Sequence, residues 1–139
     1  MSNVETIKIL YASADAVWAT ISAFHGIERY LPAVRTSSVQ GEGVGALRTC
    51  VLADGAVLRE RLTSLDRSAR TLRYELVEAP FPVRAYVATM RVEDLGDGRC
   101  ALRWGASFEV TEGPAAVFEG IFADAYSAGG DGLGRLHAS

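Results

Sequence analysis

The sequence is poor in several residue types and patterns on which whole classes of function depend. Among 139 residues there are only two cysteines and two histidines, and these show no metal-ligand spacing, so we expect no metal site. No apolar run approaches the roughly 18 residues of a membrane-spanning helix. The formal net charge of -3 argues against a basic surface for phosphates, so no nucleic-acid partner is expected.

Signatures of cofactor binding and nucleophilic catalysis are missing as well. Neither a Gly-x-Gly-x-x-Gly fingerprint nor a Walker loop occurs, and we expect no cofactor. Residues Met1 to Leu10 lack a basic segment followed by an apolar block, so we expect no secretory signal and a cytoplasmic location. In the cytoplasm, Cys50 and Cys100 would be buried reduced thiols, although the sequence alone does not exclude a disulfide between them.

What the chain does have is the composition of one globular domain, expected to span residues 1–139. Hydrophobic residues make up 49% and charged residues 22%. Residues 4–11 alternate like a strand, with Ile7, Ile9 and Tyr11 on one face. Ser13 then resembles an N-cap, and a short helix follows, with an apolar stripe of Ala14, Val17, Trp18 and Ile21. A second brief helix is expected after residues 24–27, ending at Pro32.

From residue 34 onward the pattern changes to strands separated by turn residues, and then to one long helix. Asp54-Gly55 is the strongest hairpin signal. Pro114 is expected at the first helical position, and the glycines near residue 130 would let that helix approach the sheet closely. After a strand that opens at Val34, the predicted strands are 47–52, 57–65, 71–77, 83–95 and 100–110, all antiparallel because their connections are short.

The predicted order is one strand, two short helices, six strands and a long C-terminal helix, which is an α+β layout. This order, with several local sequences, resembles the START and birch-pollen-allergen-like superfamily, in its bacterial polyketide-cyclase/dehydrase-like branch. The residues that carry the resemblance are 13–18, 45–48, 54–55, 60–62, 74, 80–83, 104 and 132–136. The resemblance implies a helix-grip fold, in which a curved seven-stranded sheet surrounds the long helix with a cavity between them. It does not imply one reaction, because the superfamily contains carriers, receptors and cyclases.

Strand alternation predicts which side chains face that helix. In the last three strands the apolar inward sets are expected to be 72, 74 and 76, then 86, 88, 90 and 92, then 100, 102, 104, 106 and 108. A two-residue turn at Asp54-Gly55 would place Thr49 opposite Glu60 and Arg48 opposite Arg61. Glu60 then becomes the acidic residue of an otherwise apolar inner face, shared with Leu47, Thr49, Val51, Leu58 and Leu62. Arg48 would lie outside with Arg59 and Arg61, and a bulge or three-residue turn would reverse this relation.

These faces define a candidate pocket with Glu60 as polar anchor, or as a carboxylate that merely satisfies local hydrogen bonds. Phe81, between two prolines, is placed at the pocket mouth, with Tyr30 and Leu31 as the opposite rim. The aromatic residues could line a pocket or simply fill the core. The predicted ligand-binding set is Tyr30, Glu60, Tyr74, Phe81, Tyr86, Met90, Trp104, Phe108, Phe118, Phe122 and Tyr126.

Three functions remain open at this stage. The leading hypothesis is a non-catalytic binding protein whose partner is a hydrophobic or aromatic small molecule. The first alternative is an enzyme of the cyclase, aromatase or dehydratase kind, with Glu60 as a weak catalytic candidate beside Tyr74 and Tyr86. The second is a protein-interaction module without a ligand, which a very small cavity would favour. His25 suits a general base by type but has no neighbour to orient it, and His137 is expected to be exposed.

Overall fold

Seven antiparallel strands form one sheet in the order β1-β7-β6-β5-β4-β3-β2. The computed structural model describes residues 1–138. The elements in chain order are β1 (Ser2–Leu10), α1 (Ala14–Ala23), the single 3-10 turn η1 (Ile27–Arg29), β2 (Val34–Gln40), β3 (Leu47–Leu52), β4 (Val57–Asp66), β5 (Thr71–Glu78), β6 (Val83–Gly96), β7 (Arg99–Val110) and α2 (Ala115–Leu136). The predicted helix-grip layout is confirmed.

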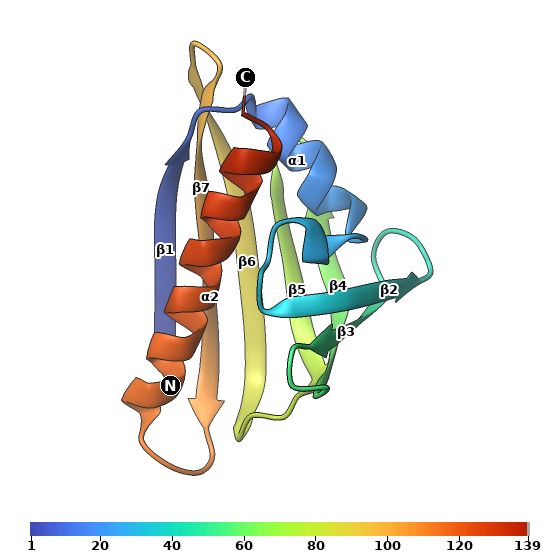
Figure 1. Cartoon of the computed structure of the whole chain (residues 1–139), viewed down its shortest axis with the longest axis vertical. Helices are drawn as coiled ribbons and strands as arrows, with labels where there is room; N and C mark the ends of the chain where they lie inside the picture. Colours follow the sequence, from blue (N-terminus) through green and yellow to red (C-terminus); the bar gives the residue numbers. More distant parts are fainter. Residues whose placement is uncertain (139) are drawn as a thin grey trace.

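The sheet curves around one layer of helices, as Figure 1 shows. The long helix α2 lies across β1 and β7, while α1 and η1 cover the other end of the same face. The buried hydrophobic residues form one cluster between the sheet and the helices. This two-layer arrangement buries one apolar core between sheet and helices, which is the usual solution for an antiparallel sheet with segregated helices.

The first helix forms where its cap residues predict. The Ser13 hydroxyl accepts a hydrogen bond from the backbone N–H of Ala16 at 3.1 Å, and Asp15 lies in the positively polarised first turn. Three buried side chains, Val17, Trp18 and Ile21, form its inner stripe. The helix ends at Phe24, whose backbone is left-handed with φ of 69°.

Alternation correctly predicts the inward faces of the three central strands. Tyr74, Met90 and Trp104 are each no more than 2% exposed, and their neighbours two residues away are also turned inward. In β6 the register shifts by one residue near Ala85, which has φ of 52°. The bulge lies near the start of the strand, and from Tyr86 onward the alternation of buried residues continues through Val92.

The apolar face of β1 is turned outward. Ile7, Ile9 and Tyr11 are 50%, 49% and 70% exposed, so the opposite side of the strand faces α2. There the stem of Lys8 packs on Gly130, and its ammonium group is 3.2 Å from the Asp131 carboxylate. A lysine fits this inner position because β1 is an edge strand and the charged head still reaches water.

The predicted register of the β3–β4 hairpin is wrong by one residue. The turn contains three residues rather than two, since the Leu52 N–H donates to the Ala56 carbonyl at 2.8 Å and Gly55 has φ of 89°. Arg48 therefore lies opposite Glu60, not opposite Arg61. The correction moves Arg48 and Cys50 to the inner face, and moves Leu47, Thr49 and Val51 off it. The predicted inward positions of Glu60, Leu58 and Leu62 are unchanged by it.

The glycines of α2 allow the close approach that the sequence predicts. A methyl group added at Gly129 would lie 2.5 Å from Trp104 Cζ3, and one at Gly132 would overlap the Tyr30 carbonyl oxygen. The helix is therefore continuous through this segment despite its low helix propensity. Pro114 is the N-cap and not the first helical residue.

Candidate functional site

A small apolar cavity lies between the sheet and α2, with a volume of about 100 Å³. Side chains from η1, β2 to β7 and α2 surround it. Its lining consists of Ile27, Leu31, Ala33, Val34, Cys50, Leu52, Leu58, Glu60, Tyr74, Leu76, Phe81, Tyr86, Trp104, Ile121, Phe122, Ala125 and Tyr126. Glu60 is the charged residue among them, so the cavity is a hydrophobic space with one ionisable group in its wall.

The structure brings seven of the eleven predicted pocket residues to this cavity. They are Glu60, Tyr74, Phe81, Tyr86, Trp104, Phe122 and Tyr126. These seven come from β4, β5, β6, β7, α2 and the connection before β6, which meet only in the folded chain.

The other four predicted pocket residues do not line the cavity. Met90 and Phe108 are fully buried, and the Phe108 ring packs 6.0 Å from that of Tyr86 between centroids. Tyr30 packs behind Trp104 at 6.4 Å, and burial raises its pKa to about 12. Phe118 is half-buried in the first turns of α2. Met90, Phe108 and Tyr30 therefore support the cavity walls instead of forming them.

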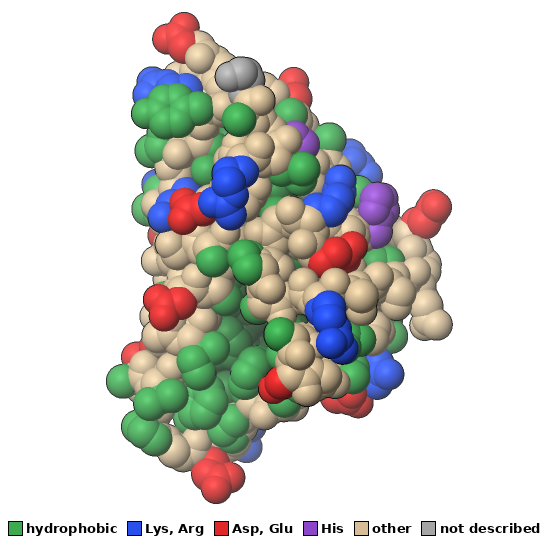
Figure 2. All heavy atoms as spheres, viewed as in Figure 1, with side chains coloured by type: hydrophobic (Ala, Val, Ile, Leu, Met, Phe, Trp, Pro, Cys, Tyr) green, Lys and Arg blue, Asp and Glu red, His purple; other side chains and the backbone are tan. Residues whose placement is uncertain are grey.

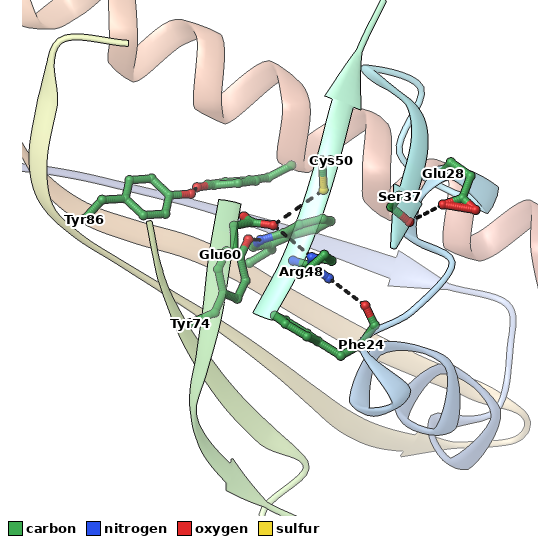
Figure 3. A network of polar contacts seen from close by, with 10 residues as sticks. Phe24, Glu28, Ser37, Arg48, Cys50, Glu60, Tyr74 and Tyr86 are labelled. Carbon is green, nitrogen blue, oxygen red and sulfur yellow. Dashed lines mark hydrogen bonds and ion pairs between the residues drawn. The ribbon is translucent and has the colours of Figure 1, made fainter. Parts of the chain in front are cut away.

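Glu60 is held by an ion pair with Arg48, which was predicted to lie on the outer face of the sheet. Arg48 Nε donates to Glu60 Oε1 at 2.8 Å, and both side chains are almost completely buried. The Cys50 thiol also approaches Oε1, at 3.8 Å. Figure 3 shows Glu60 between Arg48 on one side and Tyr86 on the other. Arg48, which does not line the cavity, thus compensates the charge of the carboxylate, while Glu60 itself borders the cavity.

The Arg48 guanidinium is enclosed by aromatic rings and backbone. Its central carbon lies 3.9 Å from the ring centre of Phe24 and 5.1 Å from that of Tyr74, and Nη1 donates to the Phe24 carbonyl at 3.3 Å. Desolvation lowers the pKa of Arg48, but the charge of Glu60 and the nearby tyrosines raise it by more, so the guanidinium stays charged. Among the described residues, Nη2 has no hydrogen-bond partner although it is buried.

The tyrosine hydroxyls of the cavity mostly contact one another or Trp104. Trp104 Nε1 donates to the Tyr74 hydroxyl at 3.0 Å, and the hydroxyls of Tyr86 and Tyr126 form a hydrogen bond between β6 and α2. Burial raises the pKa of all three tyrosines well above the ordinary value, with Glu60 adding to the effect. All three hydroxyls are consequently protonated at neutral pH.

The cavity reaches the surface beside the N-terminal half of α2. Figure 2 shows hydrophobic side chains gathered there around a hollow. Ile121 is 42% exposed, and Leu31 and Phe81 are half-buried, so these lining residues lie between cavity and solvent. Phe81 meets Phe122 edge to face, with centroids 5.5 Å apart. The predicted mouth position of Phe81 and Leu31 fits this geometry, whereas Tyr30 lies deeper.

Neither histidine borders the cavity. His25 is exposed in the turn after α1. His137 is half-buried, and its Nε2 lies 2.6 Å from the Thr20 hydroxyl, so the residue that caps α2 contacts α1. The prediction that His137 is exposed is therefore wrong. Both cysteines are free thiols, and desolvation together with Glu60 raises the pKa of Cys50 to about 12. Within residues 1–138, no group of three His, Cys, Asp or Glu side chains could hold a metal ion, and no helix could cross a membrane.

A larger hollow of about 830 Å³ lies on the outer face of the sheet. Its floor carries small and hydroxyl-bearing residues beside Arg73, Arg91 and Arg103, and Arg103 is already paired with Glu5 at 3.4 Å. It is an open depression on the outer face of the sheet. The inner cavity is the better candidate site because it is surrounded by apolar side chains and holds a buried carboxylate.

Several functional candidates were missed from the sequence. Arg48 was predicted to lie on the outer face, and Cys50 was expected only to be a buried reduced thiol. Leu58 and Leu76 were predicted to point inward but were not included in the ligand-binding set. The pairing of Arg48 with Glu60 could have been suspected, since each charge needs a partner once buried and the two residues flank one hairpin.

Comparisons with known proteins agree with this fold. A family model described as polyketide cyclase / dehydrase and lipid transport matches residues 1–138. Among solved structures, the protein XoxI from Bacillus cereus is 25% identical, with a TM-score of 0.90 over 99% of this chain and 96% of that chain. A protein from Thermobifida fusca is 29% identical, with a TM-score of 0.81 over 98% of this chain and 95% of that one.

An enzyme also shares the fold. Norcoclaurine synthase from Thalictrum flavum, solved in complex with dopamine and hydroxybenzaldehyde, is 20% identical, with a TM-score of 0.79 over 97% of this chain and 85% of that chain. At this identity the likeness concerns the fold alone. No curated protein matches the chain.

Proposed function

The chain belongs to the polyketide cyclase / dehydrase and lipid transport family, and on that premise we propose that it binds a small hydrophobic or aromatic molecule in the inner cavity without transforming it. The observation that carries the proposal is the apolar cavity between sheet and α2, open beside Phe81 and Ile121. An apolar pocket with few polar groups is the usual form of a small-molecule site.

The cavity volume limits the size of the ligand. Pockets for drug-sized molecules usually measure about 300–1,000 Å³, and the cavity of about 100 Å³ is well below that range. Dry cavities of about 150 Å³ in protein cores take up benzene. We therefore infer a ligand whose buried part is about one ring, with any remainder extending through the mouth. Norcoclaurine synthase, which shares the fold, is solved in complex with dopamine and hydroxybenzaldehyde, and both of these molecules contain a single aromatic ring. This supports the proposed size of the ligand.

The state of the ionisable groups favours binding over catalysis. The hydroxyls of Tyr74, Tyr86 and Tyr126 have raised pKa values, so they offer no base at neutral pH. Glu60 is the base that remains, and its charge is already compensated by Arg48 at 2.8 Å. The cyclase or dehydratase alternative would need Glu60 released from Arg48.

Two measurements test the binding function. Native mass spectrometry of freshly purified protein should show a co-purifying small molecule that is lost on heating. Fluorine NMR should show that para-fluorotoluene, a single ring without hydrogen-bond donors, broadens in the presence of the protein. The Ala125→Trp variant should abolish both signals, because Ala125 lines the cavity and an indole would occupy it. Absence of an adduct together with unchanged para-fluorotoluene lines in the wild-type protein would refute the proposal.

A further inference from the structure

The two oxygens of the buried Glu60 carboxylate are used unequally. Arg48 Nε and the Cys50 thiol both contact Oε1. Within the described part of the chain, Oε2 accepts no hydrogen bond, although Glu60 is only 4% exposed. Among the described residues, the fully buried side-chain polar atom without a partner is Arg48 Nη2 and not Glu60 Oε2, so Oε2 keeps some accessible surface. A ligand that covers this surface has to replace its hydration with a hydrogen-bond donor.

The unused oxygen belongs to the residue that borders the cavity. Glu60 lines the cavity, and Arg48 does not. A ligand would therefore meet the acceptor of this pair and not its guanidinium. The other polar side-chain groups of the wall already have partners: the Cys50 thiol contacts Oε1, the hydroxyls of Tyr86 and Tyr126 bond to each other, and Trp104 Nε1 donates to the Tyr74 hydroxyl. Among the described residues, the O–H of Tyr74 has no hydrogen-bond acceptor.

The charges select among ligands that carry a donor. Arg48 and Glu60 together are neutral, so an uncharged ligand leaves the buried site neutral. A ligand carboxylate would place a second negative charge beside Glu60, and a ligand ammonium would leave a net positive charge in a low-dielectric space. A hydroxyl group can donate to Glu60 and also accept from a tyrosine, which suits this wall better than a group that only donates.

We infer that the cavity selects an uncharged aromatic ring bearing a hydroxyl group, whose O–H donates to Glu60 Oε2 while the ring packs among Leu58, Leu76 and Phe122. This inference rests on the proposed binding function and adds the chemical class of the ligand. Arg48 has a positioning role, because it holds Oε1 and leaves Oε2 facing the cavity.

Four matched compounds test the selection on the wild-type protein. Para-cresol and para-fluorotoluene have nearly the same shape, but only the first donates a hydrogen bond. Para-toluate and para-methylbenzylamine form a second pair with opposite charges at neutral pH. Each is titrated into methyl-labelled protein, and the dissociation constant is obtained from NMR shifts of the cavity methyl groups.

The expected order separates this inference from the binding function itself. Para-cresol should bind about tenfold more tightly than para-fluorotoluene, because this is the contribution of one hydrogen bond to a charged group. Both charged compounds should bind more weakly than para-cresol. Equal affinities for para-cresol and para-fluorotoluene, or tightest binding of either charged compound, would overturn the inference and leave the binding function standing. Failure of all four compounds to bind would refute both.

A variant assigns the effect to Glu60. The Glu60→Gln substitution should reduce the preference for para-cresol over para-fluorotoluene by about tenfold, since the amide is a weaker acceptor. Glu78→Gln is the matched control, because Glu78 is an exposed carboxylate of β5 that pairs with Arg59 outside the cavity. If Glu60→Gln folds and retains the full preference for para-cresol, the assignment of the effect to Glu60 is wrong. If the variant does not fold, the four affinities of the wild-type protein still decide whether the cavity selects a hydroxyl group.

Discussion

At the scale of single residues, the decisive feature is the removal of Arg48 and Glu60 from water. Each charge costs several kcal/mol to bury, and the pair repays this only while both partners are present. The Phe24 ring and carbonyl complete the environment of the guanidinium. The pair links the cavity wall to the turn that follows α1.

The pair predicts strongly non-additive effects on stability. Arg48→Met leaves the Glu60 carboxylate buried without compensation and should lower the free energy of unfolding by about 3–5 kcal/mol. The double variant Arg48→Met/Glu60→Leu should recover much of that loss, because no isolated charge is left. Urea denaturation of the two single variants and the double variant measures this cycle. Additive losses would show that the two charges do not depend on each other.

His137 gives a second prediction at this scale. Desolvation, and then the charge of Arg29, lowers its pKa in the folded protein below the ordinary 6.5. The unfolded chain therefore binds the proton more readily, so stability is constant above about pH 6.5 and falls as the pH decreases through the folded pKa. His137→Gln should remove this part of the pH dependence, and His25→Gln, at an exposed turn position, should leave it unchanged. Thermal unfolding between neutral and mildly acidic pH tests the difference.

At the scale of elements, the close contact of α2 with the sheet depends on glycines whose low helix propensity is tolerated. Gly132 approaches the Tyr30 backbone, whereas a methyl group added at Gly120 would meet nothing within 4 Å beyond the neighbouring backbone of its own helix. Gly132→Ala should therefore destabilise the protein by about 1–3 kcal/mol through overpacking. Gly120→Ala in the same helix should stabilise it by about 0.5–1 kcal/mol. Equal effects of the two substitutions, measured by urea denaturation, would mean that propensity alone governs this helix.

The elements also show what sequence patterns can and cannot predict. The inward faces of β5, β6 and β7 follow from the alternation of large apolar residues along each strand. The strand boundaries follow from the turn residues between them. The β3–β4 hairpin was misassigned because Asp-Gly suits both a two-residue turn and a three-residue turn with a left-handed glycine. One residue of difference inverts a face, and so it placed Arg48 outside. The exposed face of β1 was equally hard to foresee, because an edge strand can bury the stem of Lys8.

At the scale of the whole molecule, the fold creates the cavity from parts that are far apart in the sequence. The rings of Tyr86, Trp104 and Phe122 were predicted to line it, and they do. Met90 and Phe108 were predicted to line it as well, but they fill the core behind it. Alternation cannot separate these cases, because it gives the face of a strand and not the depth of a side chain. Cavity volume likewise depends on the packing of α2 against the sheet, which no local pattern encodes.

The proposed function requires that the space between the sheet and α2 accepts a ligand, and the position of a bound ring tests this directly. Intermolecular NOEs between para-fluorotoluene and methyl-labelled protein locate the ring. We predict contacts to the methyl groups of Leu58, Leu76 and Ala125, which line the cavity. Contacts only to the exposed Ile7 and Ile9 of β1, or no contacts at saturating ligand, would contradict the account.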